Sequence, residues 1–253
     1  MTDLALRPRT STELVDTAFQ VYRRDPSHFI VAAALVYVPW LVLRLAFDIG
    51  VSTGVPTVSQ TLWAGVAGLL VYSVVGGVTT AIARDVYFDH PVGLAAAFRA
   101  VAARIGPLIG TTMVTFTFMV IGALLLLLPA LYPLARFFAA RQVVMLEDAG
   151  VGKALSRSSE LSVGMKRHIL NTLLLVGLLT LAISVGVGMI ASLISSRVLV
   201  HVVSTALSIV VYPFFGITET LLYYDVRIRK EGFDIEYLAS GGAPMTTPTV
   251  DPF

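Results

Sequence analysis

The chain has 253 residues, of which 56% are hydrophobic and 13% charged, whereas ordinary soluble domains have about 45–50% and about 25%. This composition excludes a soluble globular domain and indicates a polytopic membrane protein. The 18 Lys and Arg residues nearly balance the 16 Asp and Glu residues, so the net charge of +2 gives no reason to expect a nucleic-acid partner. The absence of cysteine excludes disulfides, thiolate metal sites and cysteine nucleophiles.

The first predicted element is an amphipathic helix over residues 11–24. Thr10 and Glu13 have the spacing of a capping box, and apolar residues then recur at helical intervals with polar residues opposite them. The same pattern returns from Leu94 to Ile105 and, with more polar residues, from Val151 to His168. We expect all three segments to lie at the inner membrane surface.

Long uncharged runs predict six transmembrane helices, because about 20 apolar residues are needed to cross about 30 Å of hydrocarbon. The predicted spans cover residues 28–47, 62–83, 105–128, 131–146, 169–193 and 198–224. The fourth is the least regular, since it is short and carries Arg136 and Arg141. Residues 240–253 are rich in Pro and Thr and have no periodicity, so we expect a disordered tail there.

The distribution of basic residues supports the fourth span. With six spans, fifteen Lys and Arg residues fall on the inner side and only Arg197 falls outside. Without the fourth span the two sides would carry eight each. The positive-inside rule therefore favours six spans, with both termini in the cytoplasm.

The predicted fold is all-α, with three hairpins that each follow an amphipathic helix and a basic junction. This order suggests a unit used three times. In a gapless alignment of the even-numbered spans, equivalent positions are held by Thr79, Arg136 and Glu219. If the repeat is real, these residues form an intramembrane polar cluster. Because a charge at mid-bilayer costs about 2.5–3.5 kcal/mol, Arg136 and Glu219 should find each other or water.

Three interpretations of this polar cluster remain open. The first is an ion pair that clamps the helices together. The second is a polar site for a solute or a lipid headgroup. The third is that the long side chains reach an interface by snorkelling.

The sequence contains no recognisable catalytic constellation. The histidines, at positions 28, 90, 168 and 201, do not have the spacing of metal ligands, and no serine lies in a nucleophile-elbow motif. Glycine-rich stretches within the spans lack the Lys that follows a phosphate-binding loop. We therefore predict no catalytic residue, no metal site and no cofactor.

The segment from Tyr223 to Ala239 mixes aromatic, basic and acidic residues at the inner end of the last span. Its aromatic residues can anchor the span, and its cations can attract anionic lipid headgroups. The interleaved carboxylates instead favour a cap that holds the interfacial helices by ion pairs, and docking of a partner is the other alternative. The candidate contact residues are Tyr223, Tyr224, Asp225, Arg227, Arg229 and Lys230.

Three stretches carry a resemblance to a known family: LRPRTSTELVDTAFQVYRRDPSHF, VVMLEDAGVGKALSRSSELSVGMKRH and YYDVRIRKEGFD. They resemble the bacterial membrane domain found ahead of the catalytic barrel in some glycerophosphoryl diester phosphodiesterases, which also occurs as free-standing membrane proteins. The resemblance runs from about Leu6 to Ala239. It implies the membrane fold and a place in the bacterial cytoplasmic membrane. It implies no activity, because the family's catalytic residues belong to a barrel that these residues do not form.

Two functional hypotheses follow. In the first, the chain is a non-enzymatic membrane module, a scaffold, anchor or regulatory partner whose partners are membrane lipids and an unidentified membrane or cytoplasmic protein. In the second, it is a small transporter or lipid-handling protein with a polar midplane site at Thr79, Arg136 and Glu219. A membrane-embedded enzyme ranks below both, because few chemically active groups lie in the spans.

Overall fold

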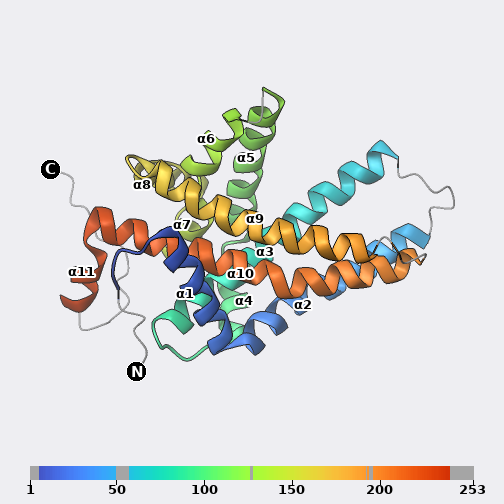
Figure 1. The fold of residues 1–253 in the computed structure, drawn as a ribbon, viewed down its shortest axis with the longest axis horizontal. Helices are drawn as coiled ribbons and strands as arrows, with labels where there is room; N and C mark the ends of the chain where they lie inside the picture. The colour runs from blue at the N-terminus through green and yellow to red at the C-terminus, as the bar shows by residue number, and fades with distance from the viewer. Residues whose placement is uncertain (1–5, 50–56, 126–127, 192, 194–195, 240–253) are drawn as a thin grey trace.

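The computed structural model describes residues 6–49, 57–125, 128–191, 193 and 196–239. These residues form helices joined by turns and loops, and no β-strand occurs among them, which confirms the all-α class. Figure 1 shows the helices, which in chain order are α1 (Ser11–Arg24), α2 (Pro26–Ile49), α3 (Val58–Tyr87), α4 (Leu94–Ala103), α5 (Ile105–Leu124), α6 (Leu128–Arg136), α7 (Ala140–Leu146), α8 (Val151–Ser162), α9 (Lys166–Ala191), α10 (Arg197–Glu231) and α11 (Phe233–Ala239). The predicted tail at 240–253 lies outside the described residues.

Within the described part of the chain, five helices are long and apolar enough to cross a membrane. Their apolar segments are Pro26–Ala46, Thr61–Tyr87, Ile105–Leu124, Lys166–Ala191 and Val198–Glu231. These segments match the first, second, third, fifth and sixth predicted spans. The structure therefore contains five helices whose length and apolar composition suit a membrane span, as the sequence predicts.

The fourth predicted span, 131–146, is not one helix. It is divided between α6, which contains Pro133 and ends at Arg136, and α7, which begins at Ala140. The Ser158 hydroxyl of α8 accepts a hydrogen bond from the Ala139 amide at 3.1 Å and donates one to the Arg136 carbonyl at 3.1 Å. A break in an apolar segment leaves backbone groups that need partners, and the fully buried Ser158 supplies them.

The amphipathic helices form where the sequence predicts them. In α1, Thr10 Oγ1 accepts a hydrogen bond from the Glu13 amide at 3.3 Å, and Glu13 Oε2 accepts one from the Thr10 amide at 2.7 Å, which confirms the capping box. Helix α4 follows the second span, and α8 occupies most of the third predicted segment. Each of these helices immediately precedes a long apolar helix in the chain: α1 precedes α2, α4 precedes α5 and α8 precedes α9.

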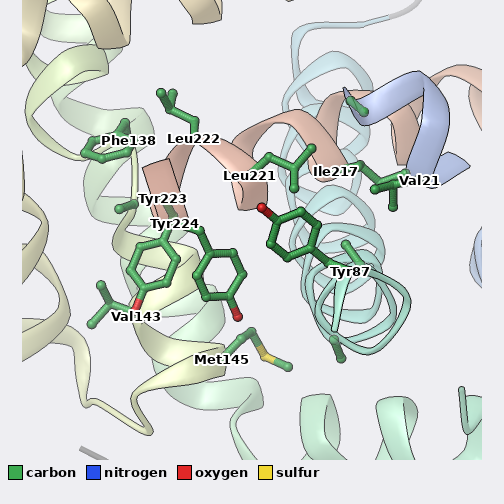
Figure 2. Close-up of a cluster of buried hydrophobic side chains, with 14 of the residues drawn as sticks. Val21, Tyr87, Phe138, Val143, Met145, Ile217, Leu221, Leu222, Tyr223 and Tyr224 are labelled. Carbon is green, nitrogen blue, oxygen red and sulfur yellow. The ribbon is translucent and has the colours of Figure 1, made fainter. Parts of the chain in front are cut away.

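The largest hydrophobic core surrounds the C-terminal half of α10. Figure 2 shows Val21 of α1, Tyr87 of α3 and Val143 of α7 around Ile217, Leu221 and Leu222 of α10. Several of these side chains are fully buried. Helix α10 packs against α1, α2, α3 and α9, so it is the central element of the fold.

Away from this core, the long helices expose apolar side chains. On α9 the exposed residues include Leu178, Leu181, Met189 and Ile190, and on α2 they include Leu35, Val42 and Leu43. Exposed apolar surface on this scale is unfavourable in water and favourable against lipid. The helices are thus held together at one end and present lipid-compatible surfaces towards the other.

The α5–α6 hairpin diverges from the direction that α9 and α10 share (Figure 1). Its two helices pack closely, since a Cβ atom at Gly122 would lie 2.7 Å from the Ala130 Cα. The hairpin joins the rest of the molecule through α3, α7, α8 and α9. The hairpin therefore separates from the other helices next to the break between α6 and α7.

Candidate functional site

A buried ion pair joins α7 to α10. The Arg141 guanidinium contacts the Glu219 carboxylate, and both side chains are about nine-tenths buried. Arg141 also lies over the Tyr72 ring of α3, with its Cζ 4.9 Å from the ring centroid. Because an unpaired charge in this environment is costly, Glu219 and Tyr72 together make the position of Arg141 tolerable.

Two glycines make room for this arrangement. A Cβ atom at Gly76 would lie 2.6 Å from the Arg141 Cζ, so only glycine leaves space for the guanidinium beside α3. A Cβ atom at Gly216 would lie 2.9 Å from the Thr79 Cγ2, so α3 and α10 approach closely at this level. Small residues have this role in many membrane-helix contacts.

Of the three predicted cluster residues, Thr79 of α3 lies beside α10. It packs against Gly216, about one turn before Glu219 on α10. The next pair of aligned residues, Thr80 and Thr220, is in contact, with the hydroxyl oxygens 3.4 Å apart. The second and sixth predicted spans therefore face each other at the depth that the alignment indicates.

The expected pairing of Arg136 with Glu219 is wrong. Arg136 is exposed at the end of α6, where its Nε donates to Ser159 Oγ at 2.7 Å. The gapless alignment assumed a continuous helix, and the break over 137–139 turns Arg136 towards α8 while Arg141 turns towards α3 and α10. The partner of Glu219 thus lies five positions further along the chain.

A small cavity of about 10 Å³ adjoins the ion pair, close to the smallest volume that holds one water molecule. Its lining comes from α3, α7 and α10 and consists of Tyr72, Val75, Gly76, Arg141, Tyr212, Phe215 and Gly216. This volume is far smaller than the pockets of about 300–1,000 Å³ that bind drug-sized ligands. The arrangement suits a hydrated ion pair better than an organic ligand.

Gln142 is the least satisfied polar residue in this region. Its side chain is fully buried, and neither its amide oxygen nor its amide nitrogen has a hydrogen-bond partner in the described part of the protein. A buried amide without partners costs about 1–3 kcal/mol. A water molecule or a polar ligand beside α7 would supply hydrogen-bond partners for the Gln142 amide.

Near the C-terminal end of α10, Asp225 connects several elements. Its carboxylate accepts hydrogen bonds from the Arg9 amide at 2.6 Å and from Arg229 Nε at 2.8 Å. His168 Nε2 lies 2.9 Å from the same carboxylate. Arg229 also donates to the Arg9 carbonyl at 2.6 Å. One carboxylate thereby links the segment before α1, the start of α9 and the end of α10.

A second group of charges links the loop before α8 to the end of α10. The Tyr223 hydroxyl donates to Glu147 at 2.7 Å, and Arg157 forms ion pairs with Glu147 at 3.2 Å and Glu231 at 2.6 Å. Burial alone would lower the pKa of Arg157, but the two carboxylates outweigh it and raise the pKa above the usual value. Arg227 completes the group through Glu231, at 2.8 Å.

Aromatic packing covers the inner side of these contacts. Tyr224 stacks on Tyr87 at a centroid distance of 5.9 Å and on Phe233 at 5.6 Å, and it meets the edge of Phe88 at 5.2 Å. Tyr223, Tyr224 and Tyr87 lie close together in Figure 2. We use the name cap for the polar and aromatic contacts of Arg9, Tyr87, Glu147, Arg157, His168, Tyr223, Tyr224, Asp225, Arg227, Arg229 and Glu231.

The six predicted contact residues near the C-terminal end of α10 are therefore engaged mainly in contacts within the protein. Tyr223, Tyr224 and Asp225 are buried, and Arg227 and Arg229 pair with carboxylates. Lys230 is exposed and donates to the Glu160 carbonyl at 2.6 Å. This arrangement corresponds to the ion-paired cap among the predicted alternatives, and not to a free basic surface.

Several residues of these sites were not predicted from the sequence. Arg141 was named only as a charge within the fourth span, and neither Gln142 nor Ser158 was singled out. The cap residues Arg9, Tyr87, Glu147, Arg157 and His168 were not predicted either. The available signal was the polar pair Arg141 and Gln142 inside an apolar run, because ionisable residues within a span are functional candidates by default. No signal in the sequence indicated that the Ser158 hydroxyl of α8 would fill the break after Arg136.

In the described residues, no group of three or more His, Asp or Glu side chains is arranged to hold a metal ion. No family model matches the chain, and no curated protein or solved structure is significantly similar to it. The resemblance to the membrane domain of glycerophosphoryl diester phosphodiesterases therefore stays a prediction. Functional inference depends on the geometry of the cap and of the buried pair.

Proposed function

We propose that the chain crosses the bacterial cytoplasmic membrane six times, with both termini in the cytoplasm. Five crossings are the long apolar helices, and the fourth is the interrupted segment formed by α6 and α7. Support comes from the cation-rich segments, which meet at one end of the molecule through Arg24 and Asp89, Arg104 and Asp148, and Arg157 and Glu231. Such a gathering agrees with the positive-inside rule.

We propose that the protein is a non-enzymatic membrane module, a scaffold, anchor or regulatory partner at the cytoplasmic face. The observation that carries this proposal is the carboxylate of Asp225, which holds three separate segments in one rigid cap. Side chains that could act on a substrate are instead engaged in contacts within the protein. A rigid, charge-compensated cap is what a protein needs in order to present a fixed surface to a partner.

The cap offers a place for such a partner on α11. Ile235 and Leu238 are 70% and 76% exposed, next to Phe233, which is buried in the cap. Two exposed aliphatic side chains on a short cytoplasmic helix suit contact with a protein or with the lipid surface. These alternatives predict different products in a crosslinking experiment.

The test places a photocrosslinking amino acid at Leu238 in cells, with a matched control at Val163, which is 64% exposed at the end of α8. We expect one defined protein adduct from position 238, and its loss in the Asp225→Ala background. Lipid adducts alone at position 238, with no protein adduct, would contradict the scaffold proposal.

The second candidate function is a small transporter or lipid-handling protein, and two observations favour it. Gln142 is a buried amide without partners, and the α6–α7 segment is interrupted, as helices at transporter binding sites often are. The site would then be Arg141, Gln142, Thr79 and Glu219 in place of the trio that contained Arg136.

An exchange variant separates the two functions. Arg141→Glu combined with Glu219→Arg keeps a pair of opposite charges, so folded yield should recover relative to either single change. In proteoliposomes, solute flux or lipid transfer by the wild-type protein that disappears in the exchanged protein would favour the transporter. Equal behaviour of both proteins, with cap-dependent crosslinks retained, would favour the scaffold.

A further inference from the structure

Two cations meet at one exposed tyrosine where α6 ends and α9 begins. The Arg136 Cζ lies 5.9 Å and the Lys166 Nζ 4.3 Å from the centroid of the Tyr132 ring. Tyr132 is 52% exposed. The ring attracts both cations, but it does not neutralise them, so their mutual repulsion remains.

Neither cation is paired with a carboxylate in the part of the chain that the structure describes. Arg104, Arg157, Arg227 and Arg229, all at the same end of the molecule, each have an acidic partner. This corner therefore differs from the ion-paired cap, because two cations share one aromatic ring without a carboxylate partner in the described residues. An anion from outside the chain would compensate both cations.

The N-terminus of α9 adds positive charge to this corner. The helix begins with Lys166, Arg167 and His168, and its first turn contains no acidic residue. A helix N-terminus carries partial positive charge, so cations in the first turn are unfavourable and an anion is favourable. His168 is compensated by Asp225, whereas Lys166 and Arg167 have no carboxylate partner among the described residues.

The polar groups at this corner fit a tetrahedral anion. Arg136 donates to Ser159 Oγ at 2.7 Å and to the Tyr132 hydroxyl at 3.4 Å, which fixes the guanidinium and leaves its Nη2 group without an acceptor in the described protein. The Lys166 ammonium has no hydrogen-bond acceptor there either. A guanidinium, an ammonium and two hydroxyl groups are typical donors to phosphate.

We propose that Tyr132, Arg136, Ser159 and Lys166 bind the phosphate group of an anionic phospholipid. A lipid fits better than a free anion because the corner lies beside the apolar α5–α6 hairpin, where acyl chains can pack against exposed residues such as Phe116, Phe118 and Ile121. The proposal rests on insertion into the membrane but not on the scaffold function. It also places lipid binding at this corner and not at the C-terminal end of α10, where Arg227 and Arg229 are already paired with carboxylates.

The test compares the purified full chain with the Arg136→Gln, Lys166→Gln double variant by native mass spectrometry from detergent. The probes are phosphatidylglycerol, phosphatidylcholine and inorganic phosphate. The control is Lys153→Gln, since Lys153 is exposed on α8, outside this corner. Two conservative single variants, Arg136→Lys and Lys166→Arg, keep the charge and guard against failure of the double variant to fold.

We expect the wild type, the control and the conservative variants to retain one phosphatidylglycerol in preference to phosphatidylcholine. We expect the double variant to bind phosphatidylglycerol roughly 30-fold more weakly, from about fivefold for each charge lost. Equal retention of phosphatidylglycerol and phosphatidylcholine by the wild type would overturn the proposal. Competition by millimolar inorganic phosphate, with no dependence on acyl chains, would assign the corner to a free anion and overturn the lipid source.

A failure of this lipid test leaves the scaffold proposal standing, because the crosslink at position 238 depends on Asp225. A lost crosslink with retained lipid binding would reject the scaffold and keep the phosphate corner. The two experiments therefore fail independently.

Discussion

Glu219 and Asp225 lie on the same helix, about 9 Å apart along its axis, yet their charges are compensated in different ways. Glu219 has one cationic partner, Arg141, in a tightly packed contact between three helices. Asp225 has several hydrogen-bond donors from three segments. Removing one partner of a single buried pair leaves the other charge uncompensated, whereas a shared network keeps some of its hydrogen bonds. The two regions should therefore lose different amounts of stability after the same kind of substitution.

The largest effect is expected from Glu219→Ala. The change leaves the Arg141 guanidinium buried without its carboxylate, which should reduce the free energy of unfolding by about 3–5 kcal/mol. Thermal unfolding and folded yield in detergent measure the loss. The double variant Arg141→Met, Glu219→Leu should recover most of it, because well-packed apolar residues often replace a buried pair. No loss in the single variant would show that the pair is not energetically coupled.

Asp225→Asn should have a smaller effect, about 1.5–3 kcal/mol, because the amide keeps the size of the side chain and some of its hydrogen bonds. The loss should be concentrated at the cap, so hydrogen exchange should accelerate in α1 and at the start of α9 but not in α5. Asp16→Asn, an exposed change on α1, serves as the control. Uniform acceleration over all helices would show that the network is not a local cap.

Gly76→Ala tests the space beside the pair. The added methyl group would collide with the Arg141 guanidinium, so we expect a loss of about 1–3 kcal/mol from overpacking. Gly68→Ala is a matched control on the same helix, because nothing lies within 4 Å of a Cβ atom there. Equal stability of the two variants would mean that α3 does not approach Arg141 closely.

The smallest effect concerns the start of α1. The Thr10 backbone amide, the Arg7 guanidinium and the Thr10 hydroxyl lower the pKa of Glu13 to about 2. A lowered pKa means that this carboxylate stabilises the folded state above its ordinary pKa near 4.5, and that the contribution is lost as the pH falls from there towards 2. NMR titration of the Glu13 carboxyl carbon should give this low pKa, and Arg7→Ala should raise it. An ordinary pKa would contradict the capping geometry.

The sequence predicts the elements of this fold better than their contacts. Apolar run length identified the five long helices, and the spacing of Thr10 and Glu13 identified the start of α1, because both depend on neighbours along the chain. The break after Arg136 depends on Ser158, more than twenty residues away, so local patterns could not reveal it. The wrong partner for Glu219 follows from that break.

The candidate sites show the same limit. The mixed charges after Tyr223 favoured an ion-paired cap, and the pairs of Arg227 with Glu231 and of Arg229 with Asp225 have the helical spacing that the sequence shows. The sequence did not indicate that His168 and the Arg9 amide would be the partners of Asp225, since these contacts join segments far apart in the chain. Long-range contacts of this kind are set by packing, which the pattern of one segment does not encode.

In the proposed topology, the charge-rich end of the helices, with its ion pairs, faces the cytoplasm. The natural absence of cysteine allows a direct test with single-cysteine variants, Ser59→Cys at the start of α3 and Lys153→Cys on α8. In intact cells, a membrane-impermeant maleimide should label the Ser59→Cys protein, and it should label the Lys153→Cys protein only after permeabilisation. Labelling of the Lys153→Cys protein in intact cells would contradict the account.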